Sequence, residues 1–130
     1  MVADIRIVGS IDEDTYEDFC LRMDVLERLA SKSKKQTTIT LEVTSEGGSA
    51  HLALAIVSRM RLSKLRINTL ATGRVASAAT IIVAAGAKRF MAKEAWFMVH
   101  EDSGELSGTI TELEHQVWHL REMENQWNQL

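Results

Sequence analysis

Hydrophobic positions follow two patterns along the chain, and the two patterns alternate. Short apolar or alternating runs at 5–8, 38–44, 66–72, 88–91 and 95–100 predict strands. Between them, apolar residues recur every three or four positions, which predicts two helices: Tyr16, Phe19, Cys20, Met23, Leu26 and Ala30, then Leu52, Ala53, Ile56, Val57 and Met60. Strands that alternate with helices are joined by right-handed crossovers. We therefore expect an α/β fold with a largely parallel sheet.

Capping signals predict where the helices begin. Asp14 and Glu17 have capping-box spacing before the first helix, and Thr109 and Glu112 have it before the last. This last helix runs to Leu130, about 33 Å at 1.5 Å per residue. It carries one apolar stripe, made of Ile110, Leu113, Val117, Leu120, Met123, Trp127 and Leu130. The stripe packs either on its own sheet or on a neighbouring subunit, and the pattern leaves both open.

Composition narrows the class of protein. A chain of 130 residues with 45% hydrophobic content fits a single domain, residues 1–130. The longest apolar run, 76–87, is too short to span a bilayer, and the N-terminus lacks a secretory pattern. One cysteine, Cys20, allows no internal disulfide. We expect a cytoplasmic protein without a metal or a cofactor.

The charge balance argues against nucleic acid as a partner. The net charge is −3, so the chain has no basic footprint. Lys32, Lys34 and Lys35 form only a short basic turn, which we expect to be solvated.

Two stretches combine small residues with exposed backbone at a predicted strand end. In Ser45–Ala50, Gly47 and Gly48 favour a sharp turn whose amides could hold an oxyanion, or simply a turn. In "GRVASAATIIVAAG", we expect a helix that opens at Gly73 and carries Ser77. The small neighbours of Ser77 serve either close packing or the clearance around a nucleophile. In the second case the amide of Ala78 would supply another oxyanion donor.

A histidine ends the last predicted strand. His100 could take the proton of Ser77, or it could be a polar strand terminus. We expect the other histidines, His51, His115 and His119, to be solvated or locally bonded. Spacing alone does not decide between these interpretations.

The runs "ITLEVTSEGGSAHLALAIVSRMR", "GRVASAATIIVAAGAKRFMAKEAWFMVHED" and "GTITELEHQVWHLREMENQWNQL" together resemble the proteolytic subunit of the Clp protease. The resemblance extends from about Ile5 to the last residue. It implies that Ser77 is the nucleophile, His100 the general base, and Gly48 and Ala78 the oxyanion hole. Gly47 and Ser49 then fall among the residues that bind substrate.

The resemblance also implies an architecture and an activity. The fold would be a ClpP- and crotonase-like repeat of β-β-α and βα units with a long C-terminal handle helix. The activity would be that of a serine endopeptidase acting on peptides or unfolded proteins, and the chain would self-assemble into a homo-oligomeric ring. No cofactor is required.

Several family features have no match here. Prolines typical of the family are replaced at Glu46, at 93–94 and at 101–102. The family's third triad member, an aspartate, follows the handle helix, and its ATPase-docking elements precede the first strand. We therefore expect a domain truncated at both ends relative to the family, for which the ATPase partnership is doubtful. Loss of the orienting carboxylate costs about 10⁴ in turnover. Three explanations remain open. The chain is a fragment of a longer protease, Glu101 or Asp102 replaces the missing aspartate, or the chain is a non-catalytic component of a ring.

Rival functions share parts of the same motif. A catalytically weak or inactive ring subunit would keep the fold without the chemistry. Phage head-maturation proteases of the same superfamily have a similar Ala-Ser-Ala-Ala turn. Acyl-CoA enzymes of the crotonase fold also use two amides around an oxyanion, but they give no reason for a serine and histidine pair. Signal peptide peptidases use a lysine base, so His100 argues against them.

Overall fold

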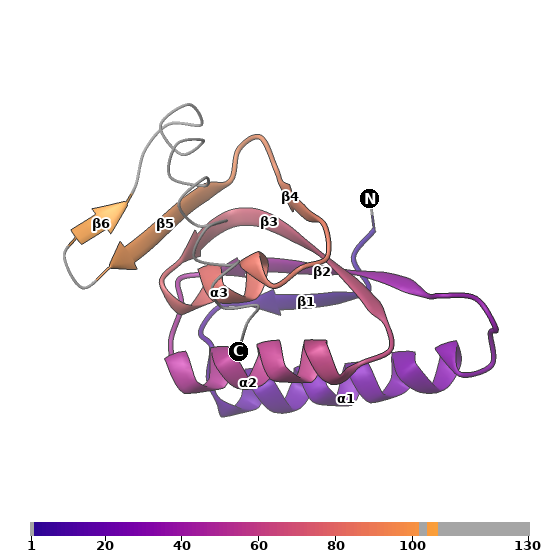
Figure 1. Cartoon of the computed structure of the whole chain (residues 1–130). Helices are drawn as coiled ribbons and strands as arrows, with labels where there is room; N and C mark the ends of the chain where they lie inside the picture. Colours follow the sequence, from indigo (N-terminus) through magenta and orange to yellow (C-terminus); the bar gives the residue numbers. More distant parts are fainter. Residues whose placement is uncertain (1, 102–103, 107–130) are drawn as a thin grey trace.

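The computed structural model describes residues 2–101 and 104–106 of the chain. In these residues strands and helices alternate, and the strands form one six-stranded sheet in the order β1-β2-β3-β5-β6, with β4 also paired to β3 (Figure 1). The elements are β1 (Ile5–Val8), α1 (Glu13–Ala30), β2 (Thr38–Ser45), α2 (Ala50–Leu62), β3 (Arg66–Ala76), α3 (Ala78–Ala84), β4 (Arg89–Met91), β5 (Trp96–Glu101) and β6 (Gly104–Leu106).

The predicted parallel sheet is confirmed. β1, β2 and β3 pair in parallel, and β3 then pairs in parallel with both β4 and β5. Residues 69–71 of β3 contact β4, whereas residues 74–76 contact β5. The short antiparallel strand β6, which pairs with β5, was not predicted from the sequence. Because β3 is the longest strand, its last residues reach the strand that carries His100.

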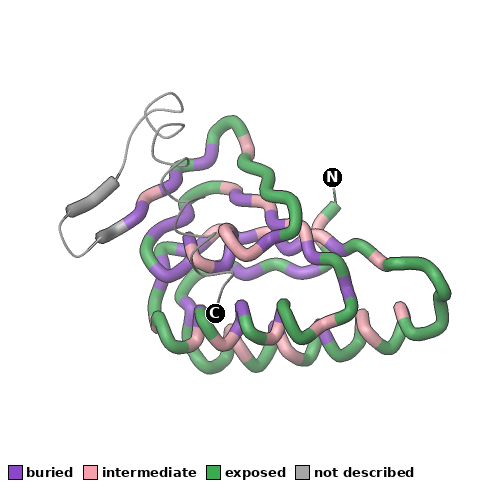
Figure 2. The backbone as a smooth tube through the Cα atoms, in the orientation of Figure 1, coloured by how far each residue is buried: buried purple, intermediate pink, exposed green. Residues whose placement is uncertain are grey.

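The core lies between the sheet and the helices α1 and α2 (Figure 2). Alternation along β1 buries Ile5 and Ile7, and alternation along β2 buries Leu41 and Val43. The predicted apolar stripes of both helices face this core. The remaining stripe residues are partly buried and pack against the six that are buried, which are Phe19, Met23, Ala53, Ile56, Val57 and Met60. Both amphipathic helices were therefore predicted correctly.

Two predicted helix boundaries are wrong. The N-cap of α1 is Asp12, not Asp14: the Asp12 carboxylate accepts a 2.9 Å hydrogen bond from the Thr15 amide. The bond lowers the pKa of Asp12. The second error concerns Gly73, which lies inside β3 and does not open a helix.

Gly73 remains within β3 because glycine readily adopts its φ of 56°, which is unfavourable for residues with a side chain. The pairing of β2 with β3 shifts register between Val43 and Ser45, beside this glycine. A Cβ at Gly73 would lie 2.5 Å from the Thr44 hydroxyl oxygen. The strand thus continues to Ala76, and α3 begins only after Ser77.

Some predictions fall on residues 107–130, outside the described residues. They include the C-terminal handle helix, its apolar stripe, and His115 and His119. Within residues 2–101 and 104–106, no helix is long and apolar enough to cross a membrane. The same residues contain no cluster of histidine, cysteine and carboxylate side chains that could hold a metal ion.

An arginine links the two long helices. Arg59 of α2 donates a 2.8 Å hydrogen bond to Asp24 of α1 and binds the Glu27 carboxylate with two nitrogens. These bonds lower the pKa of Glu27 and raise that of Arg59. The pairs are partly exposed, with 20% of the Arg59 side chain and 30% of the Glu27 side chain accessible, so they stabilise the fold only modestly.

Replacing Arg59 with leucine should lower the free energy of unfolding by about 1 kcal/mol at pH 7. A carboxylate with a depressed folded-state pKa stabilises the fold above its ordinary pKa, here 4.5, and that stabilisation is lost as the pH falls through the lowered value. The difference from wild type should therefore shrink below pH 4.5 in urea denaturation. Arg22→Leu, which removes an exposed pair with Asp18, is the control and should cost less. A difference that stays constant with pH would contradict this role of Glu27.

Candidate functional site

The two glycines after β2 form a turn that is bound tightly to the chain beside it. Gly47 and Gly48 have φ angles of 106° and 148°, a region that disfavours residues with a side chain. The Ile11 amide donates to the Gly47 carbonyl at 2.9 Å, and the Ser49 amide donates to the Ile11 carbonyl at 3.0 Å. The buried hydroxyl of Ser45 accepts from the Gly47 amide at 3.0 Å. The turn is therefore fixed both to its own strand and to the loop before α1.

Close packing explains the glycine at each position. A Cβ at Gly48 would lie 2.5 Å from the Ile11 carbonyl oxygen, so a side chain there would displace the backbone of the β1–α1 loop. A Cβ at Gly47 would lie 2.9 Å from the Cβ of Ser77 and 3.3 Å from the Ala78 nitrogen. Gly47 is thus the glycine that directly contacts the candidate nucleophile.

Ser77 joins β3 to α3 in a strained conformation. Its φ is 54° and its ψ is −128°, and it is the one non-glycine residue with positive φ in the part of the chain that the structure describes. Such a conformation costs of order 1–3 kcal/mol and persists only where the surroundings impose it. Ser77 is exposed while Ala76, Ala78 and Ala79 are buried. A strained serine at a sharp strand-to-helix turn is typical of a nucleophile elbow, which exposes the hydroxyl.

Three hydrogen bonds hold the backbone of Ser77. Its amide donates to the Met98 carbonyl of β5 at 3.0 Å. Its carbonyl accepts from the Thr80 amide at 3.0 Å and from the Thr80 hydroxyl at 2.6 Å. The sequence interpretation missed Thr80, although a hydroxyl residue three positions after the serine was a usable signal.

Two backbone amides of the candidate site have no protein acceptor among the described residues. Within residues 2–101 and 104–106, neither the Gly48 amide nor the Ala78 amide donates a hydrogen bond to backbone or side chain. These are the two amides that the sequence predicts for the oxyanion hole. Ser49, a predicted substrate-binding residue, is the N-cap of α2 and accepts from the Leu52 amide at 3.2 Å.

His100 lies on the strand next to the elbow. The structure pairs it with Glu105 in the β5–β6 ladder, two residues after the Met98 carbonyl that binds the Ser77 amide. The His100 side chain is outside the described part of the chain, so its pairing with Ser77 stays a prediction. His51 is exposed on α2, as expected.

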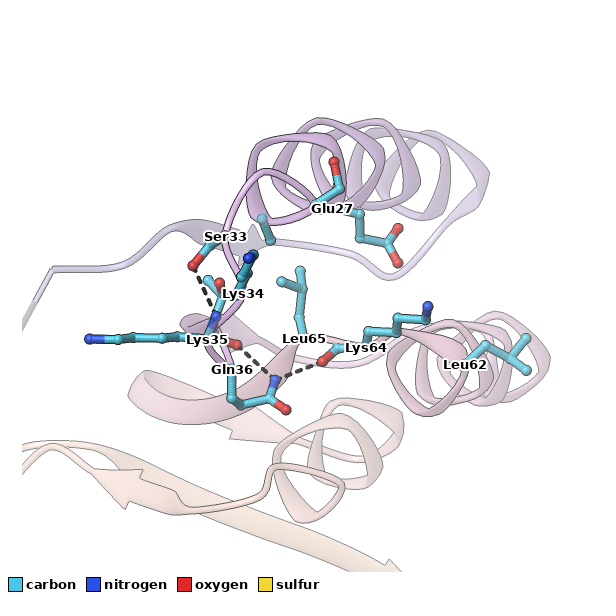
Figure 3. A pocket seen from close by; sticks show the side chains of 11 residues that line it. Glu27, Ser33, Lys34, Lys35, Gln36, Leu62, Lys64 and Leu65 are labelled. Carbon is cyan, nitrogen blue, oxygen red and sulfur yellow. Dashed lines mark hydrogen bonds between the residues drawn. The ribbon is translucent and has the colours of Figure 1, made fainter.

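The structure has a separate pocket where α1 and α2 end (Figure 3). It has a volume of about 560 Å³ and is lined by residues that include Glu27, Lys34, Gln36, Lys64 and Leu65. The Gln36 amide nitrogen donates to the Lys64 carbonyl at 2.7 Å and so ties two walls together. Its lining includes none of the candidate site residues. The predicted basic turn contributes to this pocket and is exposed.

Comparison with known proteins matches the whole described region. A profile of the Clp protease family, described as "Clp protease", matches residues 2–130. The chain is 34% identical over 119 residues to ATP-dependent Clp protease proteolytic subunit 3 of Streptomyces coelicolor and, to the same degree, to proteolytic subunit 1 of Streptomyces avermitilis. Each alignment covers 89% of this chain but only 53% of the relative. The chain thus spans about half the length of these relatives.

Solved structures give the same fold. ClpP1 of Listeria monocytogenes superposes with a TM-score of 0.70 at 22% identity, covering 92% of this chain and 70% of that one. The catalytic domain of the ClpP protease of Plasmodium falciparum gives a TM-score of 0.67 at 23% identity, covering 92% and 61%. At these identities the likeness establishes the fold alone. The match of the family profile over residues 2–130 establishes more: the chain belongs to the Clp protease family.

Proposed function

We propose that this chain is a serine-type peptidase domain with Ser77 as its nucleophile. The observation that carries the proposal is the strained, exposed conformation of Ser77 at the junction of β3 and α3. Strain of this kind clusters at functional sites, because packing alone gives no reason to hold a serine at positive φ. The buried alanines on either side leave the hydroxyl accessible to a substrate.

In the proposed reaction, the Ser77 hydroxyl oxygen attacks the carbonyl carbon of a peptide bond while His100 accepts the hydroxyl proton. The carbonyl oxygen becomes an oxyanion, which accepts hydrogen bonds from the Gly48 and Ala78 amides. His100 then gives the proton to the departing amine, which leaves an acyl-serine. Water, deprotonated by His100, hydrolyses this ester and restores the serine. Gly47 and Ser49 contribute to the adjoining substrate-binding surface.

We propose a peptide or unfolded protein as substrate and a second copy of the chain as partner. The names of the Streptomyces relatives describe them as proteolytic subunits of an ATP-dependent protease, which supports a role within a larger assembly. Ring formation through the C-terminal helix remains a prediction from its apolar stripe, and ATPase docking remains doubtful. The rival is a ring subunit that keeps the fold without activity, and labelling of Ser77 separates the two.

A fluorophosphonate probe should label wild-type protein at Ser77, identified by mass spectrometry of the modified peptide. Labelling should disappear in Ser77→Ala and persist in Ser10→Ala, an exposed serine before α1. The rate should rise as the general base loses its proton, because only the neutral imidazole accepts the serine proton. If folded wild-type protein stays unlabelled at pH 8 under prolonged exposure, the chain is a non-catalytic subunit.

A further inference from the structure

We infer that Thr80 is a positioning residue for the proposed reaction: its buried hydroxyl orients the peptide group between Ser77 and Ala78. The inference rests on the proposed role of Ser77 and adds a residue that the sequence motif does not contain. Thr80 is 5% exposed and lies in the first turn of α3, next to the elbow. It is one of three buried polar residues in the described chain, with Ser45 and Thr69.

The planarity of the peptide bond connects Thr80 to the proposed oxyanion donor. The Ser77 carbonyl and the Ala78 amide belong to one peptide group, which is planar and trans, so the C=O and N–H bonds point in opposite directions. Thr80 holds the carbonyl with two hydrogen bonds, from its amide at 3.0 Å and from its hydroxyl at 2.6 Å. Directing the carbonyl toward Thr80 therefore directs the Ala78 amide the opposite way, where it lacks a protein acceptor among the described residues.

The Thr80 hydroxyl is important because the φ and ψ angles of Ser77 are energetically unfavourable for a serine. The conformation therefore has to be stabilised by its surroundings. A half-turn of the Ser77–Ala78 peptide group would leave φ of Ser77 at 54° and move its ψ from −128° to about 50°, into the left-handed helical region, which serine tolerates better. It would also turn the Ala78 amide away from the oxyanion. Such a rotation has to break both hydrogen bonds to Thr80. The Thr80 amide alone can follow small shifts of the first helical turn, whereas the buried side chain is fixed by its packing. The hydroxyl therefore stabilises the productive orientation against the relaxed one.

Thr69 provides a matched control within the same region. It is also fully buried, and its hydroxyl donates a 2.6 Å hydrogen bond to a carbonyl of the same helix, that of Val83 at the other end of α3. Thr80→Val and Thr69→Val each exchange a hydroxyl for a methyl of similar size, and each remove one hydrogen bond to a carbonyl at an end of α3. They should lower the urea midpoint to a similar extent. Only Thr80→Val touches the peptide group beside the nucleophile.

The test measures fluorophosphonate labelling of Ser77 at several probe concentrations, which separates the maximal rate from probe affinity. Thr80→Val should reduce the maximal rate about tenfold with unchanged affinity, less than the roughly 10²–10³-fold that loss of a whole oxyanion donor costs. Thr80→Ser, which restores the hydroxyl, should return the rate to within about threefold of wild type. Thr69→Val should label within about twofold of wild type. Equal rates for Thr80→Val and Thr69→Val would overturn the inference.

A crystal structure of Thr80→Val gives a second readout that does not depend on labelling. We expect the Ser77–Ala78 peptide to rotate in this variant, so that ψ of Ser77 moves away from −128° while its φ stays positive. If the peptide keeps its orientation, Thr80 is not a positioning residue, even if labelling is slower. If wild type is not labelled at all, the proposed function fails, and the orientation of this peptide in Thr80→Val still decides whether Thr80 holds it.

Discussion

Replacing Gly47 with alanine should slow the labelling of Ser77 by a fluorophosphonate at least a hundredfold. The new Cβ would lie 2.9 Å from both the Ala76 carbonyl oxygen and the Ser77 Cβ, well inside the ordinary contact distance of 3.4–4 Å. Relief of this contact requires the turn and the elbow to move apart. A misplacement of about 1 Å at a catalytic group costs about 10²-fold in rate.

Gly9→Ala is the matched control for this substitution. Gly9 also has a positive φ, 82°, but a Cβ there would meet nothing within 4 Å. Both variants place alanine at a positive φ, and urea denaturation measures what each substitution costs in stability. Only Gly47→Ala should lose reactivity beyond what its stability explains. Equal labelling of the two variants would show that Gly47 does not shape the site.

Truncation of Phe19 should cause a large loss of stability. Phe19 is 1% exposed and lies at the centre of the core between α1 and the sheet. Phe19→Ala should lower the free energy of unfolding by about 3–5 kcal/mol, a major part of the 5–15 kcal/mol typical of a folded domain. Leu21→Ala, two residues along the same helix but 64% exposed, should change it by about 0.5 kcal/mol or less. A small effect at Phe19 together with a large one at Leu21 would mean that α1 buries its other face.

Hydrophobic periodicity was sufficient to predict most of the fold. The burial of Phe19, Met23 and Ile56 follows directly from the three- and four-residue spacing of apolar positions. Local sequence signals failed to predict element boundaries where contacts between distant segments determine the backbone conformation. Gly73 is a strand breaker by composition, yet pairing with β2 and β5 keeps it within β3. The cap at Asp12 was missed because Asp14, two residues later, satisfies the same spacing rule.

Three of the small residues that the sequence assigns to the candidate site lie close together, but the sequence could not predict how they are held. Gly47, Ser77 and Ala78 come together as expected from parallel strands that end at one edge of the sheet. The positive φ of Ser77 has no compositional signal, because this backbone region is ordinarily occupied by glycine. The roles of the buried hydroxyls of Ser45 and Thr80 were missed for a related reason. The Ser45 hydroxyl accepts from the Gly47 amide and the Thr80 hydroxyl donates to the Ser77 carbonyl, and the directions of these backbone groups are defined only in the folded chain.

The bond between the Ser77 amide and the Met98 carbonyl makes the shape of the elbow depend on β5, a strand that comes later in the chain. It joins two parallel strands through an intervening helix, and parallel pairing between distant segments forms slowly, because the loop must close before the contacts form. We therefore expect the elbow to take its strained shape only when β5 has paired with β3. A chain still being synthesised, with β5 not yet made, carries the serine without this hydrogen bond. In such a chain we expect the proposed nucleophile to react more slowly than in the folded domain.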